Sequence, residues 1–151
     1  NEGDRGIIEK AIDLTSIPKE KVRILRCEHS EIPNVLATYD CGIVMVESSY
    51  WRRVCSPTKM GEYLAGGVPV ISLEGIDAID ELAQRTLCVA TVSSEELLGQ
   101  FQEGRVEQLV SFIRLISVTQ ECQKLALEEF DLDSAGKLYV ELYSEMEARI
   151  L

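Results

Sequence analysis

Short apolar runs alternate with helix-like segments between residues 22 and 92, and this alternation constrains the fold more than any other feature of the chain. The β-prone runs are residues 22–27, 41–46, 68–73 and 87–92. The segments between them that carry apolar residues at helical spacing are residues 30–39, 56–65 and 77–85. Continuous apolar runs are typical of parallel strands covered on both faces, and strand–helix alternation favours the α/β class. We therefore predict an open parallel sheet with helices on both faces.

Helical patterns flank this alternating region on both sides. Residues 4–14 predict a first helix. After Ser93 every periodic segment is helical, and we expect a helical C-terminal segment made of residues 94–98, 106–116, 118–128 and 134–151. The last of these carries an apolar stripe, for which core packing is the ordinary role: Leu138, Tyr139, Leu142, Tyr143 and Met146. No repeat or Gly/Ser-rich linker interrupts the chain, so we expect one domain over residues 1–151.

The charge of the chain excludes several kinds of partner. The 151 residues contain 15 Lys and Arg against 26 Asp and Glu, which gives a net charge of −11. Binding to a nucleic-acid backbone or to anionic lipid depends on a basic field, so we expect no nucleic-acid partner. Any phosphate site in this chain must be local.

The cysteines and the apolar runs predict the compartment. The chain has 5 Cys, an odd number with no CxxC pair, which favours reduced and mostly buried thiols over a disulfide frame or a zinc site. No run approaches the ~18 apolar residues of a membrane span, and no signal-sequence pattern is present at the N-terminus. We predict a cytoplasmic protein without a metal site.

The sequence Ser56-Pro57-Thr58-Lys59 predicts the start of a helix after an irregular segment. First-turn amides have no partner within a helix and lie at the positive end of its dipole, so such a start can bind a phosphate-sized anion. Glu62 follows Lys59 by about one turn, where a carboxylate can accept hydrogen bonds from two ribose hydroxyls. The spacing suggests a nucleoside diphosphate; the simpler interpretation is that these residues only begin a helix.

Three residues in neighbouring loops each have two possible roles, one in binding and one as an ordinary surface residue. His29, the only histidine, follows the run 22–27 and could stack on a base or act in acid–base chemistry, or could be an exposed loop histidine. Arg52 and Arg53 could clamp a diphosphate, or could be ordinary surface cations. We include His29 and Arg53 among the candidate binding residues.

Residues 56–71, SPTKMGEYLAGGVPVI, resemble the donor-binding motif of retaining glycosyltransferases of the GT-B fold, group 1 type. Residues 31–46 are similar to the segment that precedes this motif, and residues 130–146 resemble the closing helix of the family. The resemblance implies a Rossmann-like domain that binds a UDP- or GDP-sugar without a metal or other cofactor, in an enzyme of hexosyltransferase type.

The resemblance also implies roles for individual residues. Glu62 would hold the ribose, and the amides around Thr58 and Lys59, with Ser56 and Pro57 at the helix start, would contact the diphosphate. Lys59 would stabilise the leaving diphosphate electrostatically. The loop of residues 27–30 would lie near the nucleobase. No catalytic residue is assigned beyond this.

The sequence departs from the family pattern in two places. Val54 occupies the position at which many relatives carry a glutamate near the sugar, and Glu47 at the end of its strand could compensate or could be a solvated loop acid. Nothing resembles the N-terminal acceptor-binding domain, so we expect the C-terminal half of a two-domain enzyme, inactive by itself. Peripheral membrane contact would come only through that missing domain, toward which the closing helix normally crosses, so part of its apolar stripe would be exposed here.

Two other classes of function remain possible. A receiver-like signalling domain has the same alternation, but it needs a phosphoacceptor aspartate at the carboxyl end of a strand, and Asp40 precedes its strand. A non-catalytic Rossmann-like interaction module is the third possibility. Titration with nucleotides separates both from a donor-binding domain.

Overall fold

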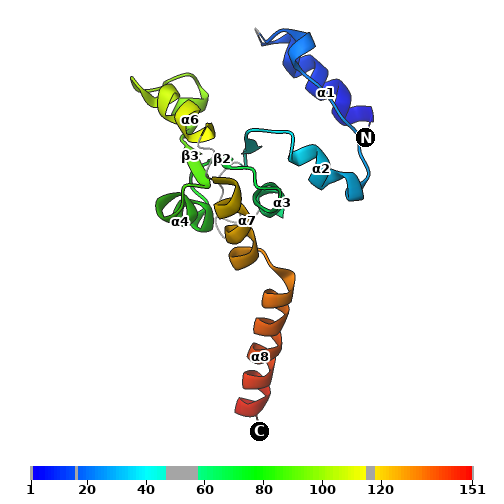
Figure 1. The fold of residues 1–151 in the computed structure, drawn as a ribbon, viewed down its shortest axis with the longest axis vertical. Helices are drawn as coiled ribbons and strands as arrows, with labels where there is room; N and C mark the ends of the chain where they lie inside the picture. The colour runs from blue at the N-terminus through cyan, green and yellow to red at the C-terminus, as the bar shows by residue number, and fades with distance from the viewer. Residues whose placement is uncertain (1, 16, 47–57, 115–117, 151) are drawn as a thin grey trace. The chain divides into compact units, whose positions relative to one another are not determined.

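The structure is a computed structural model that describes residues 2–15, 17–46, 58–114 and 118–150 (Figure 1). The chain forms two compact units, Asn1–Ile32 and Pro33–Leu151. The expectation of one domain over residues 1–151 stays a prediction.

The first unit contains helix α1 (Glu2–Asp13) and the 3₁₀ helices η1 (Lys19–Lys21) and η2 (His29–Glu31). The helix predicted over residues 4–14 is confirmed within two residues at its start and one at its end. A capping box stabilises the start of η2. The Glu28 side chain accepts a hydrogen bond from the backbone amide of Glu31, and the Glu31 side chain accepts one from the backbone amide of Glu28.

The strand predicted over residues 22–27 is wrong. These residues lie in an irregular segment between the two 3₁₀ helices. Their side chains from Arg23 to Cys27 are exposed, and only Val22 is half-buried. A strand of this composition is stabilised by a neighbouring strand and by burial of its side chains, and the described residues supply neither for this segment.

The second unit is built on three parallel strands in the order β1-β2-β3 (Figure 1). They are β1 (Gly42–Val44), β2 (Val70–Leu73) and β3 (Val89–Val92), which confirm the runs predicted at 41–46, 68–73 and 87–92 with shorter bounds. Gly42 pairs with Val70, and Val70 pairs with Val89. The chain is therefore an α/β protein with an open parallel sheet.

The core lies on one face of this sheet, under the helices α3 (Thr58–Ala65), α4 (Asp77–Arg85) and α7 (Val118–Glu129). Val44, Val70 and Val89 share this face because of the register, and they pack with side chains from all three helices. The buried helix residues of this core are Met60, Leu64, Ile79, Leu82, Cys122, Leu125 and Ala126. On the opposite face Ile43 in β1 is 62% exposed, whereas Leu73 in β2 and Val92 in β3 are buried. Helices on both faces of the sheet stay a prediction.

The remaining helices of the second unit are α2 (Ile32–Leu36), α5 (Ser94–Leu97), α6 (Arg105–Ile113) and α8 (Leu132–Ile150). The predicted helical C-terminal segment is therefore confirmed. In α8 every side chain from Leu132 to Met146 is exposed, including the whole apolar stripe, so the prediction that this stripe packs in the core is wrong. None of the described helices has the length and apolar character needed to cross a membrane.

Helix α3 ends in a turn that returns the chain directly to β2. The backbone amide of Val68 donates to Tyr63 O and that of Gly67 donates to Leu64 O, both at 2.9 Å, which is the Schellman pattern. Gly67 has φ +76°, a left-handed conformation that glycine adopts without steric cost. The helix therefore ends at Ala65, where the segment predicted over residues 56–65 ends.

Arg105 ties the start of α6 to the outer edge of the sheet. Its guanidinium donates to Thr91 O in β3 and to the Glu96 carboxylate, whose Oε1 lies 2.7 Å from Arg105 Nε. Glu96 also accepts a hydrogen bond from the Ser93 amide, and the Ser93 hydroxyl accepts one from the Glu96 amide. One carboxylate thus caps α5 and holds Arg105 in place.

Glu96→Ala is expected to lower the free energy of unfolding by about 1 kcal/mol at neutral pH, because it removes this capping bond and the partner of Arg105. The hydrogen bond from the Ser93 amide, and then the Arg105 side chain, hold the pKa of Glu96 below its ordinary value of 4.5. A carboxylate with a lowered pKa contributes stability that is present above pH 4.5 and is lost as the pH falls through the folded-state pKa. The measurement is urea unfolding of both proteins from neutral to acidic pH.

The control is Glu95→Ala, which removes an exposed carboxylate from the same helix and should change stability by less than about 0.5 kcal/mol. A difference between Glu96→Ala and the original chain that stays constant below pH 4.5 contradicts the role given to this carboxylate.

Candidate functional site

Helix α3 follows the carboxyl end of β1 along the chain, and three buried residues hold it to the core: Met60, Gly61 and Leu64. Gly61 lets it approach Phe130 closely, because a Cβ at this glycine would come within 2.9 Å of the Phe130 ring. The connections that leave the carboxyl ends of parallel strands are where ligands bind in open α/β sheets. The parallel topology therefore places the start of α3 at this edge, and its buried residues pack it against the core.

Thr58, Lys59 and Glu62 are exposed on α3. Lys59 and Glu62 stand about one helical turn apart, and neither forms an ion pair with another described residue. The described first turn carries no acidic residue, so nothing there opposes an anion at the positive end of the helix. These three side chains, predicted from local spacing, are brought together by the structure.

Of the other predicted binding residues, the structure describes His29 alone. Ser56, Pro57 and Arg53 lie outside the described residues, as do Arg52, Val54 and Glu47. His29 belongs to the first unit, where it begins η2 and is exposed. Its proposed contact with a nucleobase stays a prediction.

A pocket of about 470 Å³ lies between α4, β3 and the segment after β2, lined by Glu74, Gly75, Asp80, Ala83, Gln84 and Thr91. Asp80 Oδ2 accepts a hydrogen bond of 2.9 Å from the Gly75 amide, while Asp80 Oδ1 is buried without a protein partner. The bond from the Gly75 amide closes the turn into α4, which gives the Asp80 carboxylate a structural role. Thr58, Lys59 and Glu62 do not line this pocket.

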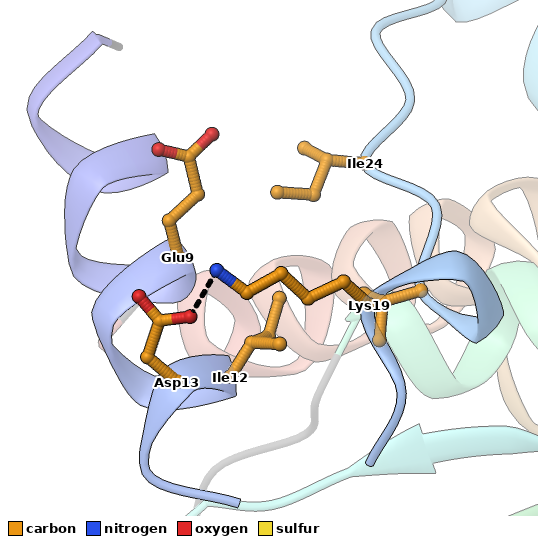
Figure 2. A pocket seen from close by; sticks show the side chains of 6 residues that line it. Glu9, Ile12, Asp13, Lys19 and Ile24 are labelled. Atoms are coloured by element: carbon orange, nitrogen blue, oxygen red, sulfur yellow. Dashed lines mark ion pairs between the residues drawn. The ribbon is translucent and has the colours of Figure 1, made fainter.

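A second hollow, of about 370 Å³, lies within the first unit between α1 and residues 19–24 (Figure 2). Lys19 pairs with Asp13 across it, and Glu9 and Ile24 lie nearby in Figure 2. The Asp13 carboxylate raises the pKa of Lys19 by hydrogen bonding and then by charge. Because both charged side chains are more than half exposed, water screens this pair and it contributes little stability.

Within the described ranges, no group of three or more His, Cys, Asp and Glu side chains is placed to hold a metal ion. The free cysteines differ in exposure: Cys88 and Cys122 are buried, Cys41 is half-buried and Cys27 is exposed. The prediction of mostly buried thiols therefore holds for Cys88 and Cys122.

No protein-family model, no curated protein and no solved structure matches this chain. What the chain binds must therefore be argued from its own residues. The group on α3 is the strongest candidate, because its cation and its carboxylate are exposed, form no ion pair with another described residue, and belong to a helix whose other side is buried.

Two features were missed by sequence reasoning. The Asp80–Gly75 bond depends on how the chain turns after β2. One hydrophobic cluster contains both Cys88, which directly precedes β3, and Cys122 of α7, which are far apart in the sequence. The apolar surroundings of both cysteines signal burial, but no local pattern shows that they share one cluster.

Proposed function

We propose that this chain is the nucleotide-sugar-binding half of a GT-B-type retaining glycosyltransferase and that α3 carries its donor site. The observation that carries the proposal is the exposed group Thr58, Lys59 and Glu62 on a helix that leaves the carboxyl edge of a parallel sheet. The sequence resemblance in residues 56–71 supports the same assignment. The proposal includes a Rossmann-like arrangement with helices on both faces and a cytoplasmic location.

The proposed roles follow from the chemistry of the three side chains. Free amides at the start of α3 and the Lys59 ammonium attract a diphosphate. Glu62, one turn further on, accepts hydrogen bonds from the ribose hydroxyls. In transfer, the same positive end would stabilise the negative charge that develops on the leaving diphosphate.

Sugar transfer also requires an acceptor site, which we assign to a second domain. The chain by itself is therefore expected to bind a UDP- or GDP-sugar without turning it over. No metal is needed for this role, because the helix start and Lys59 supply the positive charge that the diphosphate requires.

Calorimetric titration of the full chain with UDP and GDP tests the proposal. One of the two should bind, and Glu62→Ala and Lys59→Ala should each weaken that binding by roughly 10- to 100-fold, as expected for one lost charge-assisted hydrogen bond of about 1.5–3 kcal/mol. The matched controls are Glu128→Ala and Lys124→Ala, which remove an exposed acid and an exposed cation from α7. The controls should leave binding unchanged.

A 2′-deoxy nucleoside diphosphate separates the role of Glu62 from a general effect of charge. If the carboxylate holds the ribose, Glu62→Ala should weaken the deoxy ligand less than the ribose ligand, whereas Lys59→Ala should weaken both equally. Absence of binding to every nucleoside diphosphate, or equal losses in the α7 controls, refutes the proposed function.

A further inference from the structure

The pocket between α4 and β3 carries polar side chains that the proposed donor site does not use. Its volume of about 470 Å³ falls within the range of about 300–1,000 Å³ that is usual for small-molecule sites. Glu74, in its wall, directly follows the carboxyl end of β2. The pocket therefore lies at the edge of the sheet where ligands bind in open α/β folds.

Only one oxygen of the Asp80 carboxylate in this pocket has a protein partner. Asp80 Oδ2 accepts a hydrogen bond of 2.9 Å from the Gly75 amide. Asp80 Oδ1 is buried, and among the described residues nothing donates a hydrogen bond to it. A buried acceptor without a donor is destabilising, and more so when it belongs to a charged group. This oxygen therefore favours a donor that comes from outside the chain.

The other polar side chains of the pocket add acceptors and negative charge. Glu74 is exposed and supplies a second carboxylate, which forms no ion pair with another described residue. The Thr91 hydroxyl and the side-chain carbonyl of Gln84 can each accept a hydrogen bond. None of the described lining residues is a cation, and the guanidinium of Arg105, which reaches Thr91 O, is paired with Glu96. A cationic donor would balance this charge.

We propose that this pocket binds a small organic ammonium, for example one end of an aliphatic diamine. A primary ammonium carries three N–H donors, which match the acceptors of Asp80 Oδ1, Thr91 and Gln84. The exposed Glu74 carboxylate attracts the second ammonium, and Ala83 offers an apolar wall to the methylene chain. The net charge of −11 attracts such cations to the chain.

A metal ion fits this pocket less well than an ammonium. The described lining residues include only two carboxylates. Nowhere in the described ranges does a group of three or more His, Cys, Asp and Glu side chains form a metal site. A primary ammonium does not require such a group, because neutral hydroxyl and amide oxygens also accept its hydrogen bonds.

Titration of the ¹⁵N-labelled full chain with putrescine at constant ionic strength, followed by amide NMR spectra, tests the proposal. Saturable shifts are expected at the backbone amides of Gly75, Asp80 and Thr91 and at the side-chain amide of Gln84. The Gly75 signal is the most direct, because this amide donates to the carboxylate that the ammonium would contact. Butane-1,4-diol, which has the same length without charge, and magnesium chloride should produce no saturable shift.

Asp80→Asn separates the two oxygens of this carboxylate. Its amide oxygen can still accept from Gly75, whereas its NH₂ group replaces the acceptor Oδ1 with a donor. The variant should weaken putrescine binding by roughly 10-fold or more. Gln84→Ala removes one neutral acceptor from the exposed side of α4 and should weaken binding by roughly 3- to 10-fold.

The matched control is Glu81→Gln, which removes an exposed carboxylate of α4 that does not line the pocket and should leave binding unchanged. Lys59→Ala and Glu62→Ala should also leave it unchanged, so this proposal and the donor site can fail separately. The inference is overturned if putrescine gives no saturable shift at these amides, or if the diol or magnesium gives the same shifts. Unchanged affinity in Gln84→Ala, or in a folded Asp80→Asn, overturns it as well.

Discussion

Gly67→Ala is expected to lower the free energy of unfolding by about 2–5 kcal/mol, as the sum of a left-handed backbone cost of about 1–2 kcal/mol and an overpacking cost of about 1–3 kcal/mol. Gly67 has φ +76°, and a Cβ at this position would lie 2.5 Å from Thr119 Cγ2 on α7. The substitution therefore strains the turn and pushes α7 away from α3. Urea unfolding of both chains measures the difference.

Gly99 supplies a matched control. It ends α5 in the same Schellman pattern, with its amide donating to Glu96 O and the Gln100 amide donating to Glu95 O, and it has φ +86°. No atom lies within 4 Å of a Cβ built on Gly99. Gly99→Ala should therefore cost only the backbone term of about 1–2 kcal/mol.

The contact with α7 can be removed separately. Thr119→Ser deletes the methyl group that a Cβ at Gly67 would meet, so it should recover about 1–3 kcal/mol in the Gly67→Ala background and very little in the original chain. Equal losses for Gly67→Ala and Gly99→Ala, with no recovery by Thr119→Ser, would show that α7 does not pack against this turn.

Leu64→Ala is expected to lower the free energy of unfolding by about 3 kcal/mol, within the range of about 2–5 kcal/mol for buried leucines. Leu64 is 0% exposed and belongs to the cluster shared by the sheet, α3, α4 and α7. The substitution leaves a cavity that these elements can close only in part. Urea unfolding gives the loss, and circular dichroism confirms that the variant is still folded.

Leu127→Ala is the matched control, because Leu127 also lies inside a helix, α7, but is 70% exposed. It should change stability by less than about 0.5 kcal/mol. A comparable loss at both positions would place the core elsewhere than on this face of the sheet.

Local sequence patterns predicted the elements of the second unit well. The apolar runs at 41–46, 68–73 and 87–92 each contain a strand, and α3 ends at Ala65, the predicted end of the segment 56–65. Gly67 follows in the left-handed conformation that ends such a helix. The strand predicted at 22–27 failed for a non-local reason, since strand formation depends on a partner that composition does not reveal.

The candidate site, like the fold, could be predicted from sequence only where it depends on local patterns. Thr58, Lys59 and Glu62 could be placed together from sequence because they share one helix, whose periodicity is a local property. The stripe on α8 was assigned correctly to a helix, but its exposure could not be predicted, because burial depends on what packs against that helix. The presence of Cys88 and Cys122 in one hydrophobic cluster likewise follows from tertiary packing.

Arg105 blocks one hydrogen-bond acceptor on the outer edge of β3. The carbonyls of Cys88 and Val92 accept hydrogen bonds from β2, so by alternation the carbonyl of Thr91 points away from β2, and Arg105 occupies it. An exposed strand edge invites pairing with another chain, and a bound guanidinium removes one acceptor from that edge. A further strand that joins this sheet would therefore add beside β1, where Ile43 lies exposed, rather than beside β3.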